Sequence, residues 1–351
     1  MDRRDFFRRA IIFGTALAVG AAIPKAEAAS LPELIRSVKT PRTEAAANRE
    51  VDFFMNNVFP QFIIADYERR IHSSKSNAEK YKYHIHPAGE PDSYGYWNEK
   101  FHNISTEVLK FDEKLGLGLH DTHGKAVERM NELGYVYYCL PSAVGGDAIS
   151  YFFGKISDEK IVNSSGKKIR VICYENSVPP FEDYVHLFKI FGRSDIDNGK
   201  VSIDRKAINA NARYVFELGK KLKQGFSTPF GSFYDAMILK ECRHGKSAPD
   251  IAKLLEKAVV AHEINHINLA DETSIKAEIS SQLVQLYHEP YLTLAMLQQS
   301  SISDSTADQE YNVVAKEIFR KFERLGYSKE DLAKLSERKI KYIVRGLVNN
   351  I

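Results

Sequence analysis

The chain has 351 residues, of which 44% are hydrophobic and 27% are charged, as in an ordinary soluble globular protein with one large or two ordinary domains. A formal net charge of +3 is too small to suggest nucleic acid or an anionic lipid surface as the main partner. Three cysteines (Cys139, Cys173 and Cys242) are too few and too widely spaced for a metal-binding pattern or a dense disulfide framework.

Residues 1–28 predict an export signal. A basic head containing Arg3-Arg4 precedes an apolar run of 14 residues, Ala10 to Ile23, and Ala26-Glu27-Ala28 provides a small-residue cleavage site. The paired arginines resemble a twin-arginine signal, which implies a folded bacterial protein exported to the periplasm or secreted. An uncleaved anchor is the alternative, but 14 helical residues rise only about 21 Å, less than the ~30 Å hydrocarbon core. Cleavage would leave a soluble chain of net charge +1, with no membrane span.

Residues 29–130 predict a helical N-terminal region. We expect a long amphipathic helix over 48–72, a loop over 74–100, and helices over 104–115 and 124–134. Five histidines of this region match no metal-ligand spacing and are interpreted as solvated, with a place on a cleft wall left open for the last two. They are His84, His86, His102, His120 and His123.

Residues 131–300 predict the main domain of an α+β fold, which opens with a small, mainly antiparallel sheet. The expected strands cover residues 135–140, 150–156, 160–163, 168–174 and 200–203, with a turn at 163–166. We expect a loop over 194–199, a helix over 206–223, and a connection rich in glycine and aromatic residues over 225–247. Residues 301–351 predict C-terminal helices over 306–324 and 328–348 that pack on this domain.

The motif with the clearest chemical meaning is His262-Glu263-Ile264-Asn265-His266. It falls late in a predicted helix that begins at Ser247 or Asp250 and ends with a left-handed stop at Asn268. Residues four apart lie on one helical face, so two imidazoles can reach one small cation. A carboxylate beside a metal-bound water is a natural general base. The pattern therefore predicts a zinc site with Glu263 as the base.

A second helix, expected over 273–299 with a break at Pro290, offers the third ligand. The motif resembles the active-site helix of the zincin metallopeptidases. In their gluzincin branch the third ligand is a Glu on a following helix, which corresponds to Glu278. In the metzincin branch the third ligand falls where Glu272 stands, but that branch has Gly where this chain has Leu269, and Leu resists the required left-handed turn. Glu278 is the preferred ligand and Glu272 the alternative.

The resemblance implies hydrolysis of peptide bonds by zinc-activated water, with a peptide or protein substrate and a zincin-like catalytic domain. A Tyr or His usually stabilises the oxyanion, and Tyr287, His288 and Tyr291 are the candidates nearby in the sequence. We expect one strand within 150–174 to flank the cleft and pair with an extended peptide. Two alternatives stay open: a non-catalytic exported binding or assembly protein on a zincin-like frame, and a zinc hydrolase of a non-peptide amide such as that of the cell wall.

Overall fold

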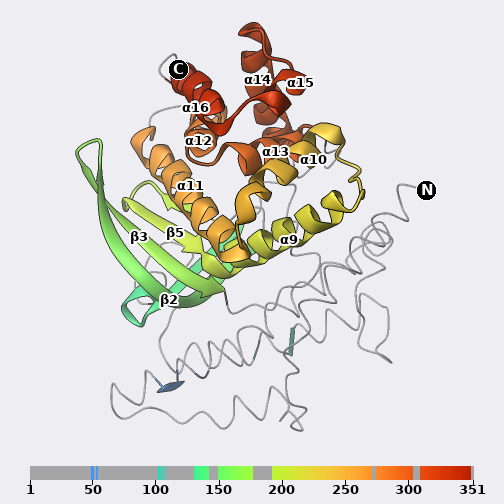
Figure 1. The fold of residues 1–351 in the computed structure, drawn as a ribbon. Helices are drawn as coiled ribbons and strands as arrows, with labels where there is room; N and C mark the ends of the chain where they lie inside the picture. The colour runs from blue at the N-terminus through green and yellow to red at the C-terminus, as the bar shows by residue number, and fades with distance from the viewer. Residues whose placement is uncertain are drawn as a thin grey trace. The chain divides into compact units, whose positions relative to one another are not determined.

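The computed structural model describes residues 49–50, 53, 102–103, 106, 130–141, 149–176, 192–270, 274–302 and 309–348 (Figure 1). The predicted export signal and the predicted loop over 74–100 lie outside the described residues. Most of the residues of the predicted helices over 48–72, 104–115 and 124–134 do as well. Among the five histidines of that region only His102 is described, and it is an exposed helical residue, as a solvated side chain would be.

The described residues divide between two compact units. Those within 157–173 and 190–351 belong to one unit, and those within 11–156 and 174–189 belong to the other. The motif helix and all the helices that follow it belong to the first unit. No helix among the described residues has both the length and the apolar character needed to cross a membrane.

A five-stranded sheet has the strand order β1-β2-β3-β5-β4. Strand β1 (Tyr135–Pro141) runs antiparallel to β2 (Ile149–Ser164), with Tyr135 opposite Lys155. β3 (Lys167–Asn176) follows, and β4 (Gly192–Asp195) pairs antiparallel with β5 (Lys200–Asp204). Together with the helices, this sheet confirms the predicted α+β class.

A tight hairpin joins β2 to β3. Ser165 and Gly166 have φ values of +49° and +76°, the left-handed pair that a two-residue type I′ turn requires. The turn falls within the predicted residues 163–166. The prediction of separate strands over 150–156 and 160–163 is wrong, because β2 continues through both for 16 residues. Its central segment, Ser157-Asp158-Glu159-Lys160, is polar and carries no hydrophobic strand signal, so pairing across the sheet decides its conformation.

Helix α9 (Arg205–Lys223) begins at Asp204, whose carboxylate accepts a hydrogen bond from the Ala207 amide. The expected connection over 225–247 is instead partly helical: it contains α10 (Ser232–Glu241), followed by a 3₁₀ turn over Arg243–Gly245. The N-cap residue of α10 is Gly231, which has φ +90°, so no side chain caps the start of the helix. The glycine-rich start therefore concealed a helix whose stability comes from its packing on α9 and α13.

The motif helix is α11 (Ala248–Asn268). Ser247 and Asp250 form a capping box at its start, with Pro249 in the first turn as expected. The predicted left-handed stop at Asn268 is wrong: Asn268 is helical, and the C-cap Leu269 has φ −104° and donates its amide to the carbonyls of Asn265 and His266.

Five helices follow α11 in the described part of the chain. They are α12 (Ser274–His288), α13 (Pro290–Ser301), α14 (Gln309–Arg324), α15 (Lys329–Lys334) and α16 (Glu337–Val348). The helix is interrupted at Glu289, just before Pro290, as predicted. The single helix expected over 328–348 is instead two, because the C-cap Leu335 is extended.

Helix α11 lies at the centre of its unit (Figure 1). It contacts α9, α12, β4 and β5, with the strands on one side and the later helices on the other. The apolar side chains of Ile251, Leu255, Ala258 and Val259 on α11 are buried. The motif thus sits at the end of a helix that the core holds on several sides.

Candidate metal centre

The two motif histidines meet on one face of α11. The Nε2 atoms of His262 and His266 are 3.1 Å apart, as expected for residues separated by one helical turn. His262 is buried, with 7% of its surface exposed, and the side chain of His266 is 18% exposed. Both rings therefore converge in a region with little water.

Helix α12 brings a carboxylate to this pair. The oxygens of Glu278 lie 3.1 Å from His266 Nε2 and 3.7 Å from His262 Nε2. His262, His266 and Glu278 form a group that could hold a metal ion, with one ligand atom from each lying within 4.8 Å of the others. Glu272, the alternative ligand, lies outside the described residues.

The spacing of these atoms fits a small cation. Ligand atoms at about 2.0–2.1 Å from a tetrahedral zinc ion lie about 3.3 Å apart. The two Nε2 atoms are 3.1 Å apart, Glu278 Oε2 is 3.1 Å from His266 Nε2, and the other oxygen, Oε1, is 3.7 Å from His262 Nε2, so each of these contacts lies near that length. Two imidazoles and one carboxylate are also a usual ligand set for a catalytic zinc that keeps a fourth position open. The residues present therefore fit a zinc ion.

The surroundings shift the pKa values of the three side chains in different directions. Burial lowers the pKa of His262 to about 4 and keeps its imidazole neutral, the form that binds metal. Burial opposes charge on His266 too, but its hydrogen bond to Glu278 and the nearby carboxylates raise its pKa overall. Burial also opposes ionisation of Glu278, yet the two imidazoles and Gln282 outweigh it and lower its pKa to about 2.

Glu263 lies beside the group and is only 8% exposed. Burial raises its pKa to about 7, a shift that hydrogen bonding to the side chain and backbone of Ser194 partly offsets. Ser194 belongs to β4, which comes unusually close to α11 at Gly192. A Cβ atom at Gly192 would lie 2.9 Å from Glu263 Cγ and 2.8 Å from Val259 Cγ1. Glycine is therefore what lets the strand approach the motif.

Strand β4 is not predicted from the sequence. Residues Ser194 and Asp195 were expected in a loop, and the strand flanking the motif was expected within 150–174. The structure instead places β4 against Glu263. Gly192-Arg193-Ser194-Asp195 has no alternating hydrophobic pattern, so only pairing with β5 makes it a strand. The sequence offers only one hint of β4, namely that Gly192 and Ser194 lie shortly before the buried strand β5.

Hydrogen bonds hold α12 in register with α11. Asn265, between the two histidines, donates through Nδ2 to the hydroxyls of Ser280 at 3.1 Å and Ser281 at 3.2 Å. On α12 itself, Gln282 Nε2 donates to Glu278 Oε1 at 2.9 Å. Partners of this kind orient metal ligands and tune their affinity. Asn265 and Gln282 are functional candidates that the motif alone does not reveal.

The β2–β3 hairpin anchors the C-terminal end of α11. Lys167 Nζ donates to the Ile267 carbonyl at 2.9 Å, and Asn268 Nδ2 donates to Ser164 Oγ at 3.1 Å. These contacts fix the last turn of α11, which carries His266.

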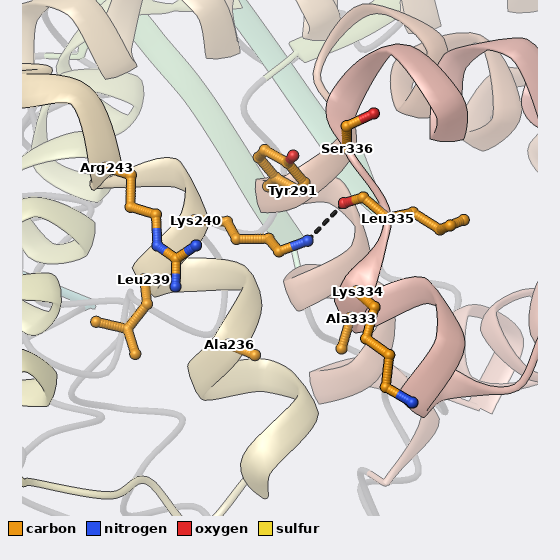
Figure 2. Close-up of a pocket in the computed structure, with 9 residues that line it drawn as sticks. All are labelled: Ala236, Leu239, Lys240, Arg243, Tyr291, Ala333, Lys334, Leu335 and Ser336. Atoms are coloured by element: carbon orange, nitrogen blue, oxygen red, sulfur yellow. Dashed lines mark hydrogen bonds between the residues drawn. The ribbon is translucent and has the colours of Figure 1, made fainter.

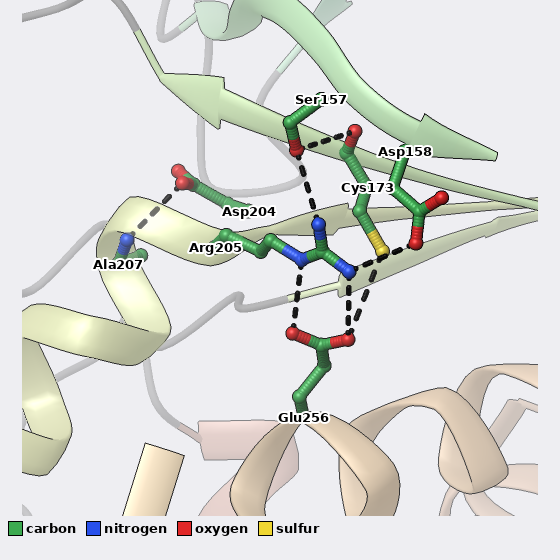
Figure 3. A network of polar contacts seen from close by, with 7 residues as sticks. All are labelled: Ser157, Asp158, Cys173, Asp204, Arg205, Ala207 and Glu256. Carbon is green, nitrogen blue, oxygen red and sulfur yellow. Dashed lines mark hydrogen bonds and ion pairs between the residues drawn. The ribbon is translucent and has the colours of Figure 1, made fainter. Parts of the chain in front are cut away.

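An ion-pair network holds the first half of α11. Arg205, the first residue of α9, donates two hydrogen bonds to the Glu256 carboxylate, from Nε at 3.0 Å and from Nη2 at 3.2 Å (Figure 3). The same guanidinium reaches Asp158 at 3.1 Å. Glu256 and Glu263 are seven residues apart and so share a helical face. The network therefore ties the face that carries Glu263 to the hairpin.

The predicted oxyanion candidates contact other parts of the molecule. Tyr287 is nine residues after Glu278, about 180° around α12, and it lines a hollow beside α16 with Arg338 and Lys341. Tyr291 lies beyond the break at Glu289, with its ring 5.2 Å from Lys240 Nζ. The rings of His288 and Tyr287 pack edge to face, with their centroids 5.5 Å apart. The structure does not bring these side chains to the metal group.

Comparison with known proteins gives no relative for this arrangement. The group of His262, His266 and Glu278 therefore rests on its own geometry and on the motif. No protein-family model matches the sequence, and no curated protein and no solved structure matches the chain.

Proposed function

We propose that the chain is an exported zinc-dependent metallopeptidase with a zincin-like catalytic domain, in which His262, His266 and Glu278 hold the metal and Glu263 is the general base. One observation carries the proposal: a carboxylate from the next helix meets both motif histidines within 3.7 Å. A five-residue motif recurs by chance in unrelated chains, whereas a third ligand at this distance does not follow from the motif.

Zinc would supply Lewis-acid activation of a water molecule and of the scissile carbonyl. Glu263 would accept a proton from the attacking water and then donate it to the leaving amine, so that water is added across the C–N bond. The low exposure of Glu263 keeps bulk water from competing for that proton. Ser194 would orient the carboxylate through its hydrogen bonds.

The substrate strand would lie along β4. This strand ends the order of the sheet, so among the described residues its outer edge has no strand partner. An extended peptide can add to such an edge through backbone hydrogen bonds. Because β4 already contacts Glu263, a peptide bound there would pass close to the base and the metal.

Two substitutions test the proposal. Glu263→Gln should leave zinc stoichiometric, measured by elemental analysis of the purified protein, and should abolish cleavage of a mixed-peptide library. His262→Ala should lose the zinc. A Glu323→Gln variant serves as the control, since Glu323 is an exposed carboxylate of α14 outside the metal group, and this variant should keep both the zinc and the cleavage activity.

The outcomes separate the alternatives. A folded protein that carries no stoichiometric metal contradicts the metal site itself. Bound zinc without peptide cleavage would favour a non-catalytic zincin-like frame. Cleavage of amide-linked cell-wall fragments but not of peptides would identify a non-peptide amidase that uses the same residues.

A further inference from the structure

A second site of interest is a cavity of about 510 Å³ on the side of α10 (Figure 2). Its wall comes from α10 and the turn after it, from Tyr291 of α13, and from the end of α15 and its connection to α16. None of the metal-site residues lines it. The lining residues are Ala236, Leu239, Lys240, Arg243, Tyr291, Ala333, Lys334, Leu335 and Ser336.

All the charged residues that line this cavity are cations: Lys240, Arg243 and Lys334. A surface hollow in a chain of nearly balanced charge would ordinarily mix both signs, because like charges at close range repel. The concentration of one sign in a concave place favours ligands of the opposite sign.

Lys240 is held in place before any ligand arrives. Its ammonium group donates to the Leu335 carbonyl and lies 5.2 Å from the centre of the Tyr291 ring (Figure 2). Burial and the charge of Arg243 lower its pKa, so the two cations are close enough to disfavour each other. An anion between them would relieve that repulsion.

Arg243 supplies the unused donors. Its side chain is exposed, and among the described residues no hydrogen bond or ion pair engages its guanidinium. A guanidinium presents a planar fork of N–H groups that matches the oxygens of a carboxylate or phosphate. Ser336 adds a hydroxyl at the start of α16, whose first turn also favours negative charge.

We propose that this cavity binds a small organic anion whose phosphate or carboxylate group lies between Lys240 and Arg243. Ala236, Leu239 and Ala333 give the rest of the wall an apolar character that suits a short carbon skeleton. The volume exceeds that of a bare inorganic ion and matches the lower range of small-molecule pockets, about 300–1,000 Å³.

Isothermal titration at low ionic strength tests the site with two probes, glycerol 3-phosphate and succinate. At least one should bind the wild-type protein, and the stronger one identifies the preferred acidic group. Arg243→Gln should weaken that binding about tenfold to a hundredfold, the loss expected for a charge-assisted hydrogen bond. Because Arg243 is exposed, this variant should fold like the wild type, which circular dichroism checks.

Two further variants complete the experiment. Lys240→Met keeps the aliphatic stem and should also weaken binding. Lys339→Gln removes an exposed cation of α16 that does not line the cavity, and it should bind like the wild type. The proposal is overturned if neither probe binds, if Arg243→Gln binds as tightly as the wild type, or if Lys339→Gln weakens binding equally, which would indicate only a diffuse charge effect. If Lys240 and Arg243 serve only to stabilise the end of α10, their substitution should lower stability, and neither probe should bind the wild-type protein.

Discussion

At Gly192 an added methyl group would meet Val259 Cγ1, Glu263 Cγ and Ile203 Cδ1 at 2.8 to 3.0 Å. All three atoms belong to buried residues, so none can move far without disturbing the core. Gly192→Ala should therefore lower the free energy of unfolding by about 1–3 kcal/mol, more than the reduced freedom of the unfolded chain returns. Urea denaturation measures the change.

The matched control is Gly346 of α16, around which an added Cβ meets nothing within 4 Å. Gly346→Ala should raise stability by about 0.5–1 kcal/mol, because alanine favours the helix. If both substitutions changed stability equally, the close approach of β4 to α11 would not be the cause. If our proposed function holds, Gly192→Ala should also reduce peptide cleavage by displacing Glu263.

Glu289 makes a pH-dependent contribution to stability. It is 3% exposed and accepts a hydrogen bond from the Thr293 amide, while Glu241, 1% exposed, pairs with Lys246 at 2.8 Å. Burial and the adjacent Glu241 raise the pKa of Glu289 well above its usual value. The folded protein thus retains a proton that the unfolded chain releases, and stability falls as pH rises from about 4.5 through the folded pKa.

Glu289→Gln removes this titration while keeping an oxygen for Thr293 and a donor for Glu241. The variant should lose less stability than the wild type between pH 5 and pH 8, by up to about 1.4 kcal/mol per pH unit below the folded pKa. Denaturation in urea at several pH values measures the difference, and metal-free protein is used so that zinc binding does not contribute. Parallel curves of stability against pH for the two proteins would contradict a raised pKa of Glu289 in the folded state.

At the scale of elements, the register of α11 against α12 sets the positions of the three candidate metal ligands. Asn265 bonds both Ser280 and Ser281, three residues from Glu278 at the farthest. Asn265→Ala should loosen this register and weaken zinc affinity about tenfold, as loss of a supporting partner typically does. Competition with a zinc-binding dye measures the affinity.

Asn268→Ala is the matched control, because Asn268 lies on the same helix but bonds Ser164 of the hairpin instead of α12. It should change zinc affinity by less than Asn265→Ala does. Equal effects would mean that general loosening of the helix end, and not the α11–α12 contact, controls the site.

The same elements explain what the sequence could predict. Helix α11 was predicted because its apolar period, its Ser247 cap and its motif agree, and Glu278 was chosen because Leu269 disfavours a left-handed turn. Leu269 indeed has φ −104°. Strand β4 and helix α10 could not be predicted, since β4 depends on pairing with β5 and α10 on packing against α9 and α13. Local patterns do not encode contacts between segments distant in the chain.

For the whole molecule, the sequence predicts export by a route that carries folded proteins. Cys173 and Cys242 are free and buried among the described residues, so no disulfide between them must form after export.

Replacing Arg3-Arg4 with Lys-Lys should therefore leave the chain in the cytoplasm in folded form, because the paired arginines are the feature that this route recognises. Cell fractionation with detection of the intact chain measures the retention, and purified cytoplasmic protein should bind zinc as the exported form does. Export of the variant at the wild-type level would contradict the twin-arginine route, and an exported wild-type protein whose sequence starts at Met1 would contradict cleavage after Ala28.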